Sequence, residues 1–230
     1  MRTEIKYLHL KQHEVTTGLT DAQILEMTEY VKVKNVNKGE SIYMEDGFEN
    51  RIYLLIKGRI KISEIDDRGD ELIKEVLTAT DIFGDVALNG GISNDEFATS
   101  FTNNTVICSY KSFDFKILMQ NNPILAMNFV QHIGAKFRCL ENRHSNLVFK
   151  DTKSRLISFF KDWANREGSR DGDKIKLTNY LTHSDIAGII STSRQSVTTL
   201  LNELKDTGML FYSRKHIEIN SRYLVNLPLS

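Results

Sequence analysis

Long apolar runs are missing from this sequence, and their absence excludes a class of protein. No run of apolar residues approaches the roughly 18 that a membrane-spanning helix needs. The first 11 residues carry charged side chains where a secretory signal would be apolar, namely Arg2, Glu4, Lys6 and Lys11. We therefore expect a cytoplasmic protein that has no membrane partner.

Cysteine is also scarce. Cys108 and Cys139 are the only two, and neither belongs to a CxxC pair. Two thiols cannot supply the four that hold an iron–sulfur cluster within one chain. Lone cysteines in a cytosolic chain are more often small buried apolar side chains than parts of a disulfide or a metal site, and we interpret both in that way.

Sequence motifs of enzymes are absent as well. We find no nucleophile elbow, no Walker loop and no cluster of metal ligands, and the isolated Ser and His residues have no paired spacing. His9 and His13 are four residues apart on an expected helix, but two histidines near a frayed terminus are usually solvated. We therefore expect that the protein is not an enzyme and that it has no metal site and no cofactor.

What the sequence does contain is a normal globular composition: 230 residues, 40% hydrophobic and 26% charged. Basic and acidic residues balance overall, but residues 151–230 hold 12 Lys and Arg against 9 Asp and Glu, a net charge of +3. This basic bias is weak evidence for a nucleic-acid partner, because phosphate binding depends on local clusters.

From about Val31 to Ser109 short apolar stretches alternate with Gly and Asp turns, and Ile60–Ile65 has the period of two of a strand with one buried face. This pattern predicts an antiparallel roll or barrel, capped by a helix around Asp21–Tyr30. The expected strands are Val31–Val36, Ser41–Met44, Ile52–Lys57, Arg59–Ile65, Glu71–Leu77 and Thr105–Ser109.

A helical region follows. A short helix at Phe113–Gln120 should end before Pro123, which suits the first turn of a long helix that continues to about Phe149. Apolar residues spaced three and four apart favour a coiled-coil seam between two copies, although one helix packing on its own domain would also explain them. The seam residues are Val130, Ile133, Phe137, Leu140, His144 and Leu147.

The remaining residues, Asp151–Ser230, indicate a small α/β unit. A helix capped by Asp151 or Thr152 should run to about Arg166, followed by a polar turn from Glu167 to Asp173 and a strand at Ile175–Leu177. We expect this helix to bury Leu156, Ile157, Phe159, Phe160 and Trp163. Two short helices and a hairpin follow, the hairpin formed by Met209–Ser213 and His216–Ile219.

The two short helices carry the clearest functional signal. Thr182 and Ser193 are good N-caps, and Val197, Leu200, Leu201 and Leu204 would bury one face of the second helix. The opposite face suits base edges in a major groove, because Arg can bridge guanine and Gln can bridge adenine. The predicted DNA-binding residues are Ser191, Thr192, Ser193, Arg194, Gln195, Ser196, Thr198, Thr199 and, on a wing, Arg214 and Lys215.

Ser193-Arg194-Gln195-Ser196-Val197, after Ile-Ala-Gly-Ile-Ile and before a Leu-rich helix and a wing, resembles the recognition segment of the Crp–Fnr family of regulators. Lys38-Gly39-Glu40, Gly58-Arg59-Ile60-Lys61 and Asn146-Leu147-Val148-Phe149-Lys150-Asp151 resemble its roll turns and hinge. The resemblance implies that Arg194 and Gln195 read bases. Thr199 departs from it, since many members place a second Arg there.

The resemblance also allows an effector pocket to be assessed. Gly84-Asp85-Val86 occupies the place of the family's Gly-Glu-Leu turn, but Glu96-Phe97 replaces the Arg-Ser pair that clamps the phosphate in cAMP-binding members. We therefore expect an effector other than cAMP, an uncharged or apolar one, or an empty pocket. The candidate pocket residues are Phe83, Gly84, Asp85, Val86, Leu88, Glu96, Phe97 and Leu140.

The sequence thus predicts an α+β protein with a cyclic-nucleotide-binding-like β-roll (residues 1–122), a long dimerisation helix (123–150) and a winged helix-turn-helix (151–230). We expect a homodimer that binds double-stranded DNA at a palindromic operator and modulates RNA polymerase. An unidentified small molecule is its expected effector. The alternative is a ligand-binding module that controls a protein partner and retains a vestigial DNA domain.

Overall fold

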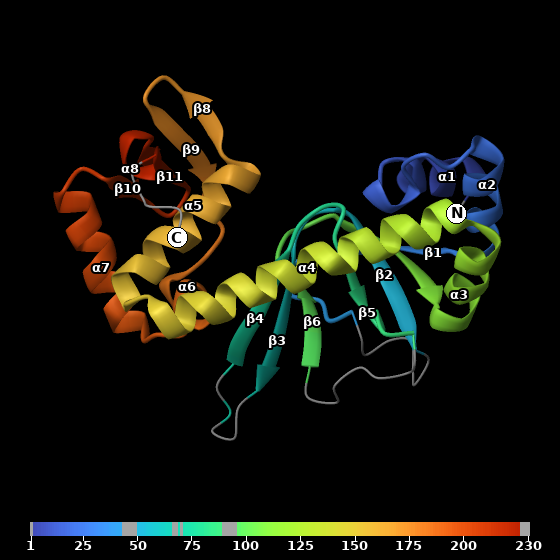
Figure 1. Cartoon of the computed structure of the whole chain (residues 1–230), viewed down its shortest axis with the longest axis horizontal. Coiled ribbons are helices and arrows are strands. Elements are labelled where there is room, and N and C mark those ends of the chain that lie inside the picture. The colour runs from blue at the N-terminus through green and yellow to red at the C-terminus, as the bar shows by residue number, and fades with distance from the viewer. Residues whose placement is uncertain (1, 43–49, 66–68, 70, 89–95, 226–230) are drawn as a thin grey trace. The chain divides into compact units, whose positions relative to one another are not determined.

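The computed structural model describes residues 2–42, 50–65, 69, 71–88 and 96–225, and the side-chain surroundings of 224 and 225 are not included. The chain divides into two compact units, residues 1–140 and 141–230. Figure 1 labels the helices and strands of both units. The α+β class expected from the sequence is confirmed.

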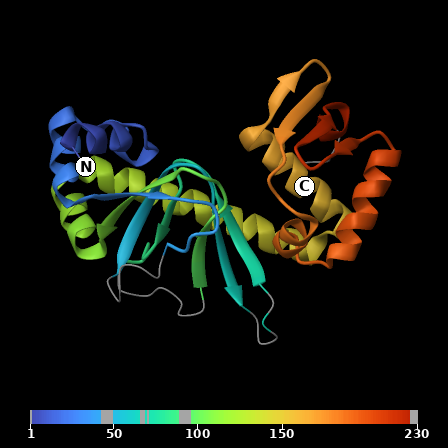
Figure 2. The ribbon, with the colours of Figure 1, turned by 180° about the vertical axis from the view of Figure 1, so that it is seen from behind.

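Unit 1 begins with helical segments that the sequence pattern only partly predicted. They are α1 (Thr3–Lys11), a 3-10 turn (Glu14–Thr16) and α2 (Asp21–Tyr30). α2 has the predicted bounds, because Thr20 and Gln23 form a capping box at its start. α1, α2 and α3 (Ser112–Asn121) lie together at one end of the strands in both views (Figures 1 and 2).

The strands of unit 1 form two antiparallel sheets. One has the order β1-β7-β2-β5 and the other β4-β3-β6. Their bounds are β1 Lys32–Val36, β2 Arg51–Lys57, β3 Ile60–Ile65, β4 Glu71–Leu77, β5 Ile82–Gly84, β6 Glu96–Ser100 and β7 Thr105–Lys111. The predicted antiparallel roll is confirmed, but β5 and β6 were not predicted. Of the expected strand Ser41–Met44, Ser41 forms only an isolated bridge to Thr99, and Tyr43 and Met44 lie outside the described residues.

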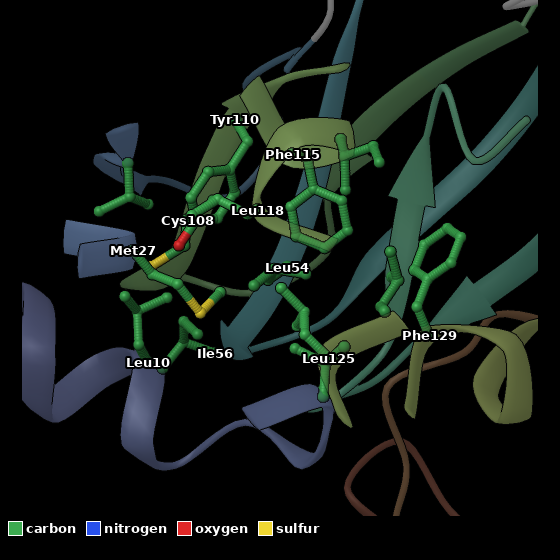
Figure 3. Packing of buried hydrophobic residues seen from close by; sticks show 14 of the residues in the cluster. Leu10, Met27, Leu54, Ile56, Cys108, Tyr110, Phe115, Leu118, Leu125 and Phe129 are labelled. Carbon is green, nitrogen blue, oxygen red and sulfur yellow. The ribbon is translucent and has the colours of Figure 1, made fainter. Parts of the chain in front are cut away.

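Strand β2 separates two cores because its side chains alternate between the faces of its sheet. Ile52, Leu54 and Ile56 join a cluster with the helices, and Tyr53 and Leu55 join a cluster with the strands of both sheets. Figure 3 shows the first cluster, which we call the helix-side core. Its residues from outside β2 include Leu10, Met27, Cys108, Tyr110, Phe115, Leu118, Leu125 and Phe129.

The two cysteines have different surroundings. Cys108 is fully buried in the helix-side core, where burial raises the pKa of its thiol to about 12. This confirms its interpretation as a small apolar side chain. Cys139 is exposed on α4 (Pro123–Phe149), so the same interpretation is wrong for it. Cys139 lies on a part of α4 where the apolar residues Phe137 and Leu140 are also exposed.

Unit 2 consists of a four-stranded sheet and the helices packed beside it. The sheet has the order β10-β11-β9-β8 and is antiparallel throughout. The helices and strands of unit 2 are α5 Thr152–Glu167, β8 Ser169–Asp171, β9 Lys174–Thr178, α6 His183–Ile189, α7 Arg194–Asp206, β10 Leu210–Tyr212, β11 His216–Asn220 and α8 Arg222–Val225. Leu156, Phe160 and Trp163 of α5 are buried as expected, whereas Ile157 and Phe159 are half-buried.

The polar stretch from Glu167 to Asp173 is where the sequence interpretation of unit 2 was wrong. It contains strand β8, which pairs with β9 through Ser169, Arg170 and Asp171. Gly172, with φ of 58°, permits the tight reversal between the two strands. Because every β8 side chain is exposed, the strand has no apolar face that a periodicity argument could detect.

Candidate nucleic-acid interface and sensor region

The first helix of the helix-turn-helix is fixed by a reciprocal cap. The Thr182 hydroxyl accepts the Asp185 backbone N–H at 3.2 Å, and the Asp185 carboxylate accepts the Thr182 backbone N–H at 2.7 Å. The helix ends at Ile190, and the turn to the next helix passes through Ser191, whose φ is 54°. Ser193 then caps α7 by accepting the Ser196 backbone N–H at 3.0 Å.

Helix α7 buries one side and leaves its N-terminal residues in solvent. Val197, Leu201 and Leu204 are buried, and Leu200 is half-buried. The buried stripe anchors the helix, so its first turn is presented outward. The exposed predicted DNA-binding residues of this region are Ser191, Ser193, Arg194, Gln195 and Thr199, and the half-buried ones are Thr192, Ser196 and Thr198.

Three of the predicted contact hydroxyls, those of Ser193, Ser196 and Thr198, are already engaged within the protein. Thr198 Oγ1 lies 2.8 Å from His183 Nδ1 and donates to the Arg194 carbonyl at 3.0 Å. Ser196 Oγ lies 2.9 Å from Ser193 Oγ. These bonds tie the first turn of α7 to itself and to α6, and they hold the predicted residues together at one end of the helix.

His183 is a residue that sequence reasoning missed. Besides its bond to Thr198, its ring packs on Tyr212 with centroids 5.2 Å apart, and Tyr212 Oη donates to the Leu181 carbonyl at 3.1 Å. Partial burial, and then the positive charge of Arg194, lower the pKa of His183. The neutral ring of His183 therefore supports α7 from the start of α6. In the sequence, only this position at the start of a helix could have indicated the role of His183.

The hairpin of β10 and β11 carries the wing. Arg214 and Lys215 are exposed in its turn. Ser213 fixes that turn, because its hydroxyl donates to the His216 carbonyl at 2.8 Å and accepts the His216 backbone N–H at 3.1 Å. Both cations are thus presented from a defined turn rather than from a long loop.

Arg155 of α5 is a second residue that the sequence did not single out. Its guanidinium donates to the Ile190 carbonyl at 3.0 Å, the Lys150 carbonyl at 3.1 Å and the Ser191 carbonyl at 3.2 Å. Ile190 and Ser191 form the turn before α7, and Lys150 directly follows α4.

The predicted effector residues of unit 1 do not share one cluster. Phe83 stacks on Tyr53 with centroids 4.9 Å apart, within the core between the sheets. Val86 and Leu88 pack instead against the helix-side core. The structure therefore brings Phe83 together with the strands and separates its side chain from those of Val86 and Leu88.

The turn after β5 is close-packed. Gly84 has φ of 89°, and a Cβ there would lie 2.4 Å from the Arg51 carbonyl oxygen. Asp85 is fully buried, and its backbone N–H donates to the same carbonyl at 2.9 Å. Glycine is required at position 84 by both its backbone angle and this approach.

Glu96 and Phe97, which the sequence resemblance assigns to the family's clamp position, lie on β6. Glu96 pairs with Lys74 at 3.3 Å, and Lys74 also pairs with Glu64 at 3.2 Å. Phe97 is half-buried opposite Ser63 on β3. Leu140, on α4, is 61% exposed.

Helix α4 is tied to strand β5 by two side chains. His132 Nε2 accepts the Ile82 backbone N–H at 3.1 Å, and Lys136 Nζ donates to the Ile82 carbonyl at 3.2 Å. Lys136 also pairs with Glu75 at 3.0 Å. Burial lowers the pKa of His132 and raises that of the neighbouring Asp81. A neutral His132 is what the bond requires, because only an unprotonated ring nitrogen accepts.

The interpretation of His13 as a solvated surface residue was wrong. Helix α1 ends at Lys11, and His13 is 2% exposed, with Nδ1 accepting the Val15 backbone N–H at 3.1 Å. His13 caps the following 3-10 turn and therefore does not share a helix face with His9. Within the described ranges, no group of three His, Cys, Asp or Glu residues is placed to hold a metal ion.

Most of the apolar face of α4 is exposed in the part of the chain that the structure describes. Val130, Phe137 and Leu140 are 62%, 59% and 61% exposed, and Leu147 is 46% exposed. His144 is also exposed. Ile133 is the exception, because it packs partly against the helix-side core. Five of the six seam residues therefore present side chains to solvent in the single chain.

A hollow of about 440 Å³ lies between α1 and α2, and none of the predicted effector residues lines it. In the part of the chain that the structure describes, no helix combines the length and the apolar character that crossing a membrane requires.

Two family models match the chain. The model of the cyclic nucleotide-binding domain matches residues 33–122, and that of the Crp-like helix-turn-helix domain matches residues 154–223. Together they cover most of the sequence.

Known proteins resemble the chain over most of its length. The global nitrogen regulator of Synechococcus elongatus is 28% identical over 191 residues, 82% of this chain and 86% of that protein. The CRP-like cAMP-activated global transcriptional regulator of Mycobacterium tuberculosis is 21% identical, over 88% of this chain and 90% of that one. A solved structure of a CooA mutant from Carboxydothermus hydrogenoformans has a TM-score of 0.74 at 23% identity, covering 93% and 94% of the two chains, and shows a shared fold.

A helix-turn-helix unit joined to a cyclic-nucleotide-binding-like unit defines a DNA-binding transcription regulator with a sensor domain. Within that class, the chain belongs to the Crp–Fnr family, as its sequence motifs indicated.

Proposed function

We propose that the protein is a homodimeric, cytoplasmic regulator that reads a palindromic operator through α7 and acts on RNA polymerase. The observation that carries the proposal is the presentation of Arg194 and Gln195, exposed at the start of a helix whose opposite face is buried. An Arg or Gln in this place reaches base edges when the helix enters the major groove.

Residues around this helix are suited to contact the sugar-phosphate backbone of DNA. Ser191, Thr192, Ser193 and Thr199 carry short hydroxyls near the same helix end, and Arg214 and Lys215 extend from the wing. Such groups bind phosphates, which are common to every sequence. Ser193, Ser196 and Thr198 also fix the first turn of α7, because the Ser193 hydroxyl bonds to Ser196 and the Thr198 hydroxyl bonds to His183 and to the Arg194 carbonyl.

The proposed dimer rests on α4. Its uncovered apolar residues repeat at coiled-coil spacing, with the polar His144 among them. A dimer would cover these side chains and place two copies of α7 on one duplex, which is how two-fold symmetric regulators match palindromes. Relatives named as a global nitrogen regulator and as a global transcriptional regulator support this role, which involves no catalysis.

The proposed effector of unit 1 is not a cyclic phosphate. Some relatives carry names that describe them as cAMP-activated. In this chain the clamp position holds Glu96, whose carboxylate is paired with Lys74, and the phenyl ring of Phe97. An anionic phosphodiester needs a cationic partner and several donors when it is buried. We infer an uncharged or apolar effector, or none.

The test of the proposed function is binding-site selection with Arg194→Ala, Arg214→Ala and Lys215→Ala beside wild type. A bidentate Arg–guanine pair contributes about 1–3 kcal/mol of discrimination, so Arg194→Ala should weaken the selected operator far more than a random duplex. Each wing variant should weaken binding to both duplexes alike. It should also lower the slope of log affinity against log salt concentration by about one unit per lost phosphate contact.

Two results would contradict the proposal. Arg194→Ala with the full wild-type sequence preference would show that α7 does not read bases. Wild type without salt-dependent duplex binding would favour the alternative, a module that controls a protein partner.

A further inference from the structure

Arg155 connects two stretches of backbone that have separate roles in unit 2. Its Nη1 donates to the Lys150 carbonyl, which directly follows α4. Its Nε and Nη2 donate to the Ile190 and Ser191 carbonyls in the turn between α6 and α7. One planar guanidinium thus binds three main-chain carbonyls, at distances from 3.0 to 3.2 Å.

These carbonyls are suitable acceptors because helices leave their last carbonyl groups without partners. Ile190 is the C-cap of α6, and Lys150 follows the last residue of α4. A positive charge is also stabilised at the negative end of a helix dipole. The guanidinium has five N–H groups in a fixed fork, so Arg can reach several carbonyls at once, whereas Lys offers a single nitrogen.

The turn that Arg155 binds determines where α7 begins. Ser193, the cap of α7, lies two residues after Ser191, and Arg194 and Gln195 follow it. Ser191 has φ of 54°, a left-handed conformation that a non-glycine residue adopts only when its surroundings impose it. The bond from Arg155 to the Ser191 carbonyl is one of those surroundings.

We propose that Arg155 is a positioning residue for DNA recognition, which ties the backbone that follows α4 to the turn that starts α7. Through this tie, the direction in which the chain leaves α4 sets the presentation of Arg194 and Gln195. The proposal rests on the proposed function of α7 as the helix that reads DNA. It gives α5 a second task besides filling the core of unit 2.

The first test measures affinity for the selected operator and for a random duplex at one salt concentration, in the full-length protein. Arg155→Gln should weaken the operator complex by about tenfold or more, because hydrogen bonds from a charged donor to three carbonyls are lost. Its effect on the random duplex should be several times smaller. Arg155→Lys should recover part of the operator affinity, since an ammonium keeps the charge and reaches some of the carbonyls.

The matched control is Arg166→Gln, which removes an exposed Arg from the last turn of the same helix. It should leave the ratio of operator to random-duplex affinity unchanged. If Arg155→Gln weakens both duplexes equally, Arg155 is a phosphate contact and the proposal is wrong. If it weakens neither, the tie is irrelevant to recognition and the proposal is equally wrong.

A second measurement separates positioning from general stability. The Thr192 amide donates to the Ala187 carbonyl and the Lys150 amide donates to the Asn146 carbonyl, so both should be protected from hydrogen exchange. Arg155→Gln should accelerate exchange at both segments together, while amides of the sheet strands β9 and β11 stay protected. Acceleration at one segment only, or across the whole unit, would contradict the tie.

This design also separates the two proposals. Wild type that fails to bind any duplex would contradict the proposed function, and the exchange measurement would still decide whether Arg155 joins the two segments. Wild type that binds its operator, together with an Arg155→Gln variant that binds it equally well, would overturn only the role of Arg155.

Discussion

Ser191 holds the turn of the helix-turn-helix in a left-handed conformation that costs a residue with a side chain about 1–2 kcal/mol. Ser191→Gly removes that cost but gives the unfolded chain more freedom, worth about 0.4–1 kcal/mol. We expect a net gain of about 0.5 kcal/mol in the free energy of unfolding, measured by urea denaturation.

A second serine, two residues further along the chain, provides a control with the opposite effect on stability. Ser193 caps α7, so Ser193→Ala should lower the free energy of unfolding by about 1 kcal/mol. A Ser191→Gly variant that is less stable than wild type would show that the Ser191 side chain contributes contacts that outweigh its backbone strain.

His13 makes stability depend on pH. Burial lowers the pKa of His13 to about 4, with a smaller lowering from the neighbouring His132, although the contact with the Asp81 carbonyl opposes the shift. Its pKa in the unfolded chain is about 6.5. Between these values the unfolded chain binds a proton that the folded protein excludes, so the free energy of unfolding falls as the pH decreases, by up to about 3 kcal/mol.

His13→Asn tests this dependence, because an amide oxygen can accept the Val15 N–H without titrating. Thermal unfolding from pH 7 to pH 4.5 should show a smaller loss of stability in the variant than in wild type. Equal losses would assign the acid sensitivity to other groups, His132 among them, whose pKa burial also lowers.

Single residues were the least predictable part of the molecule. The caps Thr182 and Ser193 followed from local sequence, because a cap bonds to a residue three positions away. Arg155 and His183 did not, since their partners lie 35 and 15 residues away. Burial of His13 likewise depends on strands and helices distant in sequence, which no local pattern reports.

At the scale of elements, the proposed dimer seam of α4 gives a direct prediction. Truncating a buried Leu typically costs about 2–5 kcal/mol, and a carboxylate in the seam adds the cost of burying a charge. Leu140→Asp should therefore convert a dimer to a monomer in sedimentation experiments and abolish operator binding. Folding within each chain should persist, because Leu140 is 61% exposed there.

The control is Asn142→Asp, an exposed position two residues further along the same helix and off the predicted seam. It introduces the same charge and should remain dimeric. Wild type that sediments as a monomer at micromolar concentration would refute the seam altogether.

Helices and strands were predictable where the pattern of their own residues determined them. The bounds of α4 follow from Pro123 at its first position and from the polar residues that follow Phe149. Strands β5 and β6 were missed because each is short and is defined by pairing with β2 or β3 rather than by its own alternation. The effector residues depend on those two strands, so the sequence grouped Phe83 with Val86 and Leu88 although their side chains enter different cores.

At the scale of the whole molecule, an effector can change operator affinity only if it binds two states of the regulator with different affinities. The connections that could report on unit 1 are His132 and Lys136, which bond to Ile82 just before the turn of Gly84 and Asp85. A ligand that moved β5 would act on α4 through these bonds, and α4 carries the proposed dimer seam. A molecule that does not bind unit 1 cannot act on α4 through these bonds.

For this reason cyclic AMP should leave the regulator unchanged. Calorimetric titration of the full-length protein with cAMP or cGMP should give no heat of binding at physiological concentrations, and operator affinity should be the same with and without either nucleotide. The expected physical cause is the pair that we assign to the clamp position, where Glu96 would repel a phosphate and the side chain of Phe97 offers no donor. A double variant, Glu96→Arg with Phe97→Ser, supplies the missing cation and hydroxyl in the same fold. Heat from this variant alone would attribute the loss of nucleotide binding to these two residues, whereas a wild-type dissociation constant in the low micromolar range would show that Glu96 and Phe97 do not stand at the clamp position.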